Sequence, residues 1–403
     1  MADRLLDVVI NGGGVVGLAL AAALDGHGLK VAVVEAREPP AWNPEQTDLR
    51  VSSITGASRR LLMRLGVWDT LEHSRVSPFD AIHAWDAGGG LVRFNAADIG
   101  EPWLGHIVEN GLLQRTLYDH VRSRCRQVTL FCPGSIQAVD LTPAEFVRLR
   151  LDDGRRLRSR LLVGADGADS AIREQAGISV RRRAYGQQGV VAAVRMEQQH
   201  GGVARQRFLP GGPLALLPLD DGRCSIVWSV PDAEAESLLG LEDAAFREAL
   251  GEASEHVLGP VLEVGARRAF ALQSLHADRY IAGRVALVGD AAHVIHPLAG
   301  QGVNLGLLDA AALAEVLIGA AARGRDLGSL PALRRYERWR RGDNLVMQQA
   351  MDGFNWLFSN SDPLRHTVRN IGFHLTDRLP SVKRRFMEYA VGVRGDLPGL
   401  AKP

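Results

Sequence analysis

The sequence predicts an α/β fold with three parts: a discontinuous α/β domain, an antiparallel β-sheet domain inserted into it, and a C-terminal helical region. Two observations favour this fold. Short apolar runs that end near glycine and an acidic residue recur around residues 12, 166 and 290, and each is typical of a strand leading into a turn. The intervening segments break at glycine and proline, as short antiparallel strands do. We expect the discontinuous domain at 1–80, 100–180 and 275–330, the sheet domain at 81–99 and 181–274, and helices over 331–403.

The first element is a glycine-rich turn after an N-terminal strand. Leu6 to Asn11 is mostly apolar, and Gly12 to Gly17 then fits G-x-G-x-x-G before an Ala-rich helix. These glycines permit a tight turn, close approach to a pyrophosphate and close helix–strand packing. A second strand, Lys30 to Val34, ends in Glu35, where a carboxylate can hold a ribose 2′-OH and would repel a 2′-phosphate. The predicted contacts to an adenine dinucleotide here are Gly12, Gly14, Val16, Gly17 and Glu35.

A segment near residue 290 favours FAD over NAD. An apolar run, Val285 to Val288, leads to Gly289-Asp290, and a Gly-rich turn then opens a helix that ends near Ala322. An acidic residue at a strand end suits a polyol, and the N-terminus of a helix suits an anionic head group. This combination describes a flavin on its ribityl chain, which NAD lacks. The predicted contacts from this segment are Gly289, Asp290, Pro297, Gly300, Gly302, Val303 and Asn304. A third apolar run ends in Asp166-Gly167 and adds Asp166.

With these elements in this order, the chain resembles the FAD-dependent hydroxylases of ubiquinone biosynthesis, which belong to the flavoprotein monooxygenases of the para-hydroxybenzoate hydroxylase type. The resemblance runs nearly end to end. It is also carried by Asp48 to Ile54, Leu65 to Trp68, Leu104 to Asn110 with Gln114, Gly289 to Gly306, Ser359-Asn360 and Asp377 to Pro380. Val203 to Gln206 and Cys224 to Ser229 resemble the 2-polyprenylphenol hydroxylase branch, and the C6 ring hydroxylase is the second branch considered.

The resemblance implies a site and a reaction. Arg50 and Gln114 would contact the ribose and phosphates of non-covalently bound FAD. The alternative for Arg50 is a surface arginine without a ligand, and the alternative for Gln114 is a helical glutamine without one. For Asp166 the alternative is a structural cap. NAD(P)H would dock transiently, O2 would form a flavin C4a-hydroperoxide, and one oxygen atom would pass to the ring of a polyprenylated phenol or quinol. No catalytic base is identified. His293, His296 and Pro297 are candidates near the flavin, with packing the favoured interpretation of both histidines.

Two other functions stay open. One is a prenyl-chain reductase or halogenase on the same scaffold. The other is a non-catalytic flavoprotein that holds a ubiquinone-biosynthesis complex together. Such a complex is also an expected partner of the hydroxylase, and the sequence leaves a homo-oligomer open.

Composition adds expectations about partners and compartment. The 403 residues carry a formal net charge of +1, which gives no indication of nucleic-acid binding. Residues 331–403 hold 13 Lys/Arg against 7 Asp/Glu, so this tail either contacts an anionic membrane surface or is a solvated helical face, the favoured interpretation. Cys125, Cys132 and Cys224 lack metal-ligand spacing and are typical of reduced thiols. We therefore expect a cytoplasmic protein without a membrane span, with peripheral contact at the inner membrane for a lipidic substrate.

Overall fold

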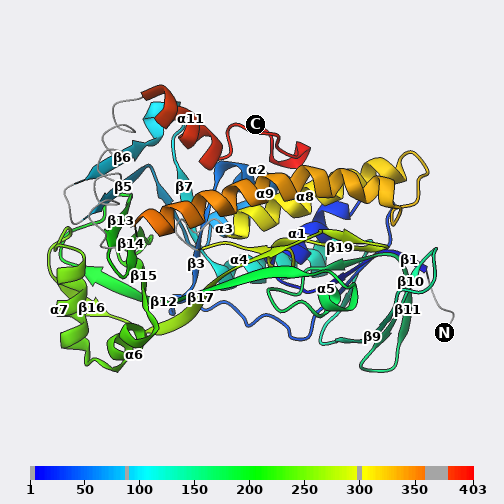
Figure 1. The fold of residues 1–403 in the computed structure, drawn as a ribbon, viewed down its shortest axis with the longest axis horizontal. Helices are drawn as coiled ribbons and strands as arrows, with labels where there is room; N and C mark the ends of the chain where they lie inside the picture. The colour runs from blue at the N-terminus through cyan, green and yellow to red at the C-terminus, as the bar shows by residue number, and fades with distance from the viewer. Residues whose placement is uncertain (1–4, 87–89, 297–301, 359–379) are drawn as a thin grey trace.

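The structure is a computed structural model that describes residues 5–86, 90–296, 302–358 and 380–403. Two large sheets stand at opposite ends of an elongated molecule, and two long helices run side by side between them (Figure 1). These are α8 (Gly302–Ala321) and α9 (Leu330–Phe358). The first sheet and the helices packed against it position most of the described residues of the predicted cofactor site.

The first sheet has eight strands and a central parallel layer. Its parallel strands are β1 (Leu5–Asn11), β2 (Val31–Val34), β8 (Val128–Phe131), β11 (Arg156–Gly164) and β19 (Val285–Leu287). Antiparallel strands extend it: β9 (Ile136–Asp140), β10 (Val147–Leu151) and β18 (Ile281–Ala282). The central strands are buried on both faces because α1 (Val15–Leu24), α4 (Asn110–Arg124) and α8 pack around them.

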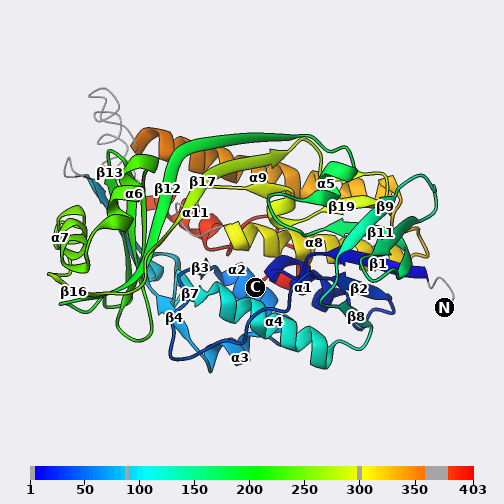
Figure 2. The same cartoon turned by 90° about the horizontal axis from the view of Figure 1, so that it is seen from below.

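The second sheet has nine strands and is mostly antiparallel. Its strands are β5 (Ala81–Asp86), β6 (Leu91–Asn95), β12 (Val180–Met196), β13 (Val203–Leu209), β14 (Gly212–Pro218), β15 (Cys224–Pro231), β16 (Val261–Val264), β17 (Arg268–Ala277) and β20 (His293–Val294). One face is covered by α6 (Asp232–Gly240) and α7 (Asp243–Ala253), with Phe246 and Trp228 in the core between them. The long strands β12 and β17 extend from this sheet towards the first one (Figure 2).

The remaining elements connect these layers. A three-stranded sheet contains β3 (Val51–Ile54), β4 (Val76–Phe79) and β7 (Gly105–Glu109). The short helices are α2 (Gly56–Arg64), α3 (Trp68–Glu72), α5 (Ala171–Gln175), α11 (Pro380–Ala390) and the 3-10 turns η1 (Ala96–Ile99), η2 (Gly289–Ala291) and η3 (Gly399–Ala401). Met387 of α11 and Val391, which follows this helix, are buried in a cluster with Phe79 and Ile99.

Several elements differ from their predicted extent. Strand β12 runs from Val180 to Met196, although the sequence predicts short strands that break at glycine, because a shift in register near Gly186, which has a positive φ of 65°, lets one strand continue across a turn-like sequence. Helix α6 was not predicted. Strand β20 belongs to the second sheet, although the sequence assigned its residues to the first domain, so the exact domain boundaries stay a prediction. In the helical region predicted over 331–403, the described residues contain α9 and α11.

Among the residues that the structure describes, one helix is long and apolar enough to cross a membrane by length and composition. This is α8, and 72% of its most apolar window is buried inside the protein. A buried core helix can have the same length and composition, and α8 packs against α1 and α9 as such a helix does.

Candidate cofactor site

The glycine-rich turn between β1 and α1 is held by close backbone contacts. Gly12 has a φ of +115°, and a Cβ there would lie 2.3 Å from the carbonyl oxygen of Ala165. A Cβ on Gly17 would lie 2.0 Å from the oxygen of Gly12. Around Gly14 there is open space, because a Cβ there would meet nothing within 4 Å. Gly14 is also the N-cap residue of α1 and offers no side chain to cap the helix. The turn therefore leaves space and free N–H groups at a helix N-terminus, which suits a pyrophosphate.

Two side chains fix the peptide groups of this turn. Oε2 of Glu35 accepts a hydrogen bond of 2.6 Å from the N–H of Gly13, and Oε1 accepts one from Arg37. Nε2 of Gln114 on α4 donates to the oxygen of Gly13 at 3.0 Å. Each Glu35 oxygen keeps a second lone pair, so the half-buried carboxylate can still accept a ribose hydroxyl. Glu35 and Gln114 thus hold the turn itself, whatever else they contact.

The Gly289-Asp290 turn lies against the first helix. Gly289 has a φ of +59°, and a Cβ there would lie 3.1 Å from Cγ2 of Val16. A Cβ on Gly306 in α8 would lie 2.5 Å from the same methyl group. Val16 therefore packs against both glycines and brings α1, the turn and α8 together. The side chain of Asp290 is exposed, yet desolvation raises its pKa, with His293 and Arg50 opposing the shift. The exposure of the side chain and its raised pKa are compatible if the carboxylate is accessible to solvent but closely surrounded by protein.

Behind this turn, a fully buried carboxylate joins three elements. Asp309 of α8 is 0% exposed, and its Oδ2 lies 2.5 Å from Nε2 of His293 and accepts from the N–H of Gly289 at 3.2 Å. Its Oδ1 accepts from Nε of Arg340 and Nδ2 of Asn344, both on α9 and both at 2.9 Å. Burial alone would raise its pKa, but His293 and Arg340 hold the pKa of Asp309 at about 2. We call these five residues the Asp309 network.

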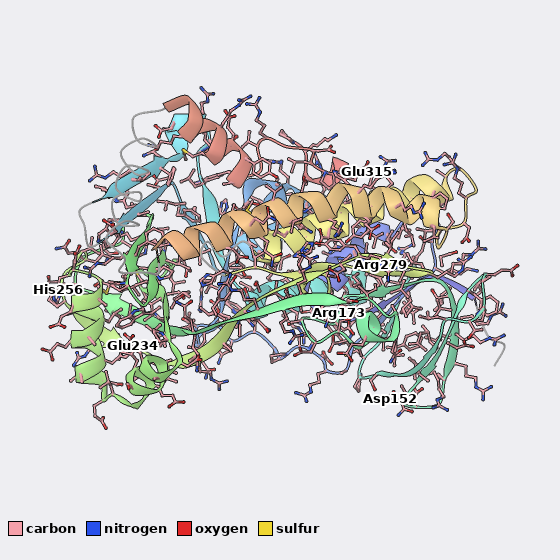
Figure 3. The ribbon with its side chains drawn as sticks, viewed as in Figure 1. Asp152, Arg173, Glu234, His256, Arg279 and Glu315 are labelled. Carbon is pink, nitrogen blue, oxygen red and sulfur yellow. The ribbon has the colours of Figure 1, made fainter. Side chains whose placement is uncertain are left out.

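A second buried cation supports the same turn from the other side. Arg173 of α5 is 2% exposed and donates from its guanidinium to the carbonyl oxygen of Ala291 at 3.0 Å. Figure 3 labels Arg173 beside α5, near the middle of the molecule. The Gly289-Asp290 turn is therefore fixed by donors from α5 and by the Asp309 network.

Other predicted residues have protein partners. Asp166 accepts from Nδ2 of Asn11, from the hydroxyl of Ser170 and from the N–H of Ile172, which matches its alternative reading as a structural cap. Asn304 is 2% exposed and donates to the oxygen of Ser53, so it ties α8 to β3.

The last group of predicted residues lies at the surface or in and beside segment 297–301, which is outside the described residues. Arg50 is exposed, and its guanidinium carbon lies 5.2 Å from the centre of the Phe270 ring. Pro297 and Gly300 lie outside the described residues. Gly302 and Val303 form the first residues of α8, as predicted, and a Cβ on Gly302 would meet nothing within 4 Å.

The two candidate histidines have different surroundings. His293 belongs to the Asp309 network, so its interpretation as a packing residue fits. His296 is 1% exposed, and neither of its ring nitrogens has a hydrogen-bond partner among the residues that the structure describes.

Sequence reasoning missed Asp309, Arg340 and Asn344. A lone carboxylate within the apolar run Leu307 to Ala314 is the signal that identifies Asp309. Arg340 lies in an arginine-rich stretch, where nothing in the sequence distinguishes it.

Comparisons with known proteins agree with this geometry. Residues 5–349 match the family model described as FAD binding domain. The 3-demethoxyubiquinol 3-hydroxylase of Escherichia coli (strain K12) is 40% identical over 394 residues, which cover 98% of this chain and 100% of that protein. The ubiquinone hydroxylase UbiL of Rhodospirillum rubrum is 40% identical over 393 residues, covering 97% and 90%.

A solved structure shows the same fold. The p-nitrophenol 4-monooxygenase PnpA from Pseudomonas putida DLL-E4 superposes with a TM-score of 0.79 at 22% identity, covering 97% of this chain and 100% of that one. The residues of the site fit FAD, and the matches extend over nearly the whole chain. The chain therefore belongs to the FAD-dependent monooxygenases, within the family of ubiquinone-biosynthesis hydroxylases.

Proposed function

We propose that this enzyme hydroxylates the aromatic ring of a polyprenylated phenol or quinol in ubiquinone biosynthesis, with NAD(P)H as the reductant and O2 as the source of oxygen. Two relatives at 40% identity, both named for ubiquinone or its precursors, support this substrate class. The substrate carries a polar ring and an apolar chain, so the enzyme must bind both.

The observation that carries the proposal is the convergence of two helix N-termini and an accessible carboxylate on one site. In this proposal, the N–H groups of α1 at Gly14 bind the pyrophosphate and Glu35 binds the adenosine ribose. Asp290 binds the ribityl hydroxyls, while the start of α8 at Gly302 approaches the isoalloxazine. Arg50 lies near enough to Asp290 to oppose the rise in pKa that desolvation causes in that carboxyl, and there it would approach the FAD phosphates.

Bound FAD would take a hydride from NAD(P)H and activate O2 for transfer of one oxygen atom to the ring. The chain itself contributes binding, orientation and exclusion of water. The N–H groups and positive dipole end of α8 would stabilise negative charge on the cofactor. Where the second sheet meets α8 and α9, apolar side chains pack together and would exclude water from the reacting groups. They are Ala84, Val92, Phe208, Ile295, Leu305 and Met351. We call this set the apolar junction.

The substrate has two candidates. The resemblance of Val203 to Gln206 and Cys224 to Ser229 to the 2-polyprenylphenol hydroxylase branch favours a polyprenylphenol. The identity to the Escherichia coli enzyme favours a demethoxyubiquinol instead. Both have a ring hydroxyl and an isoprenoid chain, and they differ in the other ring substituents.

We also propose peripheral contact between the C-terminal region and an anionic membrane surface, from which an isoprenoid substrate can be taken. The excess of six basic residues over 331–403 supports this contact. On α11, however, Lys383 lies 3.7 Å from Asp98 and Arg384 lies 2.9 Å from Glu388, so part of this charge is balanced within the protein.

The experiment is single-turnover hydroxylation under 18O2. FAD-loaded enzyme is mixed with NADPH and, in separate reactions, a polyprenylphenol and a demethoxyubiquinol with one isoprene unit each. We expect the preferred substrate to gain one labelled oxygen atom by mass spectrometry. If NADPH is oxidised slowly, with hydrogen peroxide as the sole product for both compounds, the proposal fails in favour of a non-catalytic flavoprotein.

A further inference from the structure

A buried histidine without a partner lies between the cofactor turn and the second sheet. His296 follows Asp290 by six residues and is 1% exposed, and both ring nitrogens lack a hydrogen-bond partner among the described residues. Buried polar groups in native proteins are nearly always hydrogen-bonded, because an unpaired one loses its bonds to water without replacement. His296 therefore calls for a ligand that brings a donor or an acceptor.

The surroundings of His296 define one polar cluster. Its ring meets the ring of Tyr185 edge-on, with centroids 4.9 Å apart and planes at 72°. The hydroxyl of Tyr185, on the long strand β12, donates to a carboxylate oxygen of Asp352 on α9. We call these three residues the His296 trio. The trio joins the segment after β20, strand β12 and helix α9.

The trio borders the apolar junction through its neighbours in the chain. Ile295 precedes His296 and is 5% exposed in that junction, and Met351 precedes Asp352 and is 7% exposed there. In each of these two pairs of adjacent residues, one residue belongs to the polar trio and the other to the apolar junction, so the two regions border each other. A molecule with an oxygen-bearing ring and a hydrocarbon chain would satisfy both regions together.

The ionisation of the trio indicates what His296 can bind. Burial lowers the pKa of the His296 imidazole to about 4, so at neutral pH the ring is uncharged, with one nitrogen accepting and the other donating. The Tyr185 proton is engaged by Asp352. A base this weak is poorly suited to remove the proton of a phenol, but it accepts a hydrogen bond from one well.

We propose that His296 binds the ring hydroxyl of the substrate and so determines which ring carbon faces the cofactor. This inference rests on the proposed function, because it takes a phenol or quinol as the ligand. It assigns to His296 a role in substrate orientation, with Tyr185 and Asp352 as positioning residues that fix the imidazole plane.

The test compares two ligands that differ only in the hydroxyl. The oxidised FAD-loaded enzyme is titrated with 2-prenylphenol and with its methyl ether, and each dissociation constant is measured from the change in flavin absorbance. For the wild type we expect about tenfold tighter binding of the phenol, as for one buried hydrogen bond. In His296→Phe we expect the two ligands to bind within about twofold of each other. His296→Gln, which keeps a donor and an acceptor, should retain part of the preference.

The matched control is another buried, neutral histidine. His106 on β7 is 4% exposed, its Nδ1 also lacks a partner, and burial with help from Arg59 lowers its pKa to about 4. His106→Phe should keep the wild-type preference for the phenol. Retention of that preference in His296→Phe would overturn the inference. So would equal weakening of both ligands together with lost FAD affinity, which indicates a structural role. A wild type that binds neither ligand contradicts the proposed function itself.

Discussion

Substitution of Arg340 by methionine tests the Asp309 network. Methionine keeps most of the side-chain length but leaves Asp309, which is 0% exposed and ionised, without its buried counter-ion. Removing one partner of a buried pair costs about 3–5 kcal/mol, since the remaining charge is desolvated and uncompensated. Asn344, His293 and the N–H of Gly289 still donate to Asp309, so we expect the lower end, about 3 kcal/mol.

The assay is urea unfolding of the apoprotein, followed by circular dichroism, together with FAD titration of the folded protein. FAD should bind more weakly as well, because the network holds the Gly289-Asp290 turn. The double variant Asp309→Asn with Arg340→Met removes both charges and should recover part of the lost stability. Arg338→Met, at an exposed position on the same helix, is the control and should change stability by less than about 0.5 kcal/mol. A loss below about 1 kcal/mol in Arg340→Met, or a double variant no more stable than the single one, would refute the reasoning.

Three further outcomes are expected. Asp290→Asn should weaken FAD binding by roughly 1–3 kcal/mol in a fluorescence titration while the apoprotein keeps its melting temperature; unchanged affinity would remove Asp290 from the site. Gly302→Val should leave folding intact, since a Cβ there meets no described atom, but raise the hydrogen peroxide released per NADPH; full coupling would contradict a role for the start of α8 at the cofactor. His106 has a pKa lowered from 6.5 to about 4, so it contributes stability that is present above pH 6.5 and is lost as the pH falls towards 4. His106→Phe should therefore flatten the pH dependence of unfolding by roughly 3 kcal/mol across that window, and an unchanged slope would show that His106 does not titrate there.

The part of the site that the sequence predicts is local. Gly12, Gly14 and Gly17 lie in one strand–turn–helix unit, and Glu35 follows the next strand, so their spacing in the sequence locates them, although the close contact at Gly12 is with Ala165 after β11. The glycine turn, Asp166 and Asp290 also predict a discontinuous domain, and in the structure the strands that lead to them, β1, β11 and β19, are neighbours in the first sheet.

What the sequence could not predict depends on contacts between distant residues. Arg340 donates to Asp309, which lies 31 positions earlier in the chain. Helix α9 contains several arginines, and the sequence does not indicate which of them points into the core. On α11, Tyr389 is 41% exposed, whereas Met387 is buried, as is Val391 just after the helix. Periodicity gives the helix, but the partner surface on η1 and β7 selects the buried face.

The position of Val16 has a consequence for sequence variation. Its Cγ2 methyl would lie 2.5 Å from a Cβ at Gly306 and 3.1 Å from one at Gly289, and a β-branched side chain in a helix cannot rotate away. A library that randomises position 306 alone should therefore return glycine almost exclusively. A library that also allows alanine at position 16 should admit alanine at 306, since the smaller side chain frees the volume that the new methyl group needs. The two positions should behave as an epistatic pair, in which the side chain at position 16 of one helix limits which residues position 306 of the other accepts, with the Cα of Gly289 as the next contact at 3.2 Å.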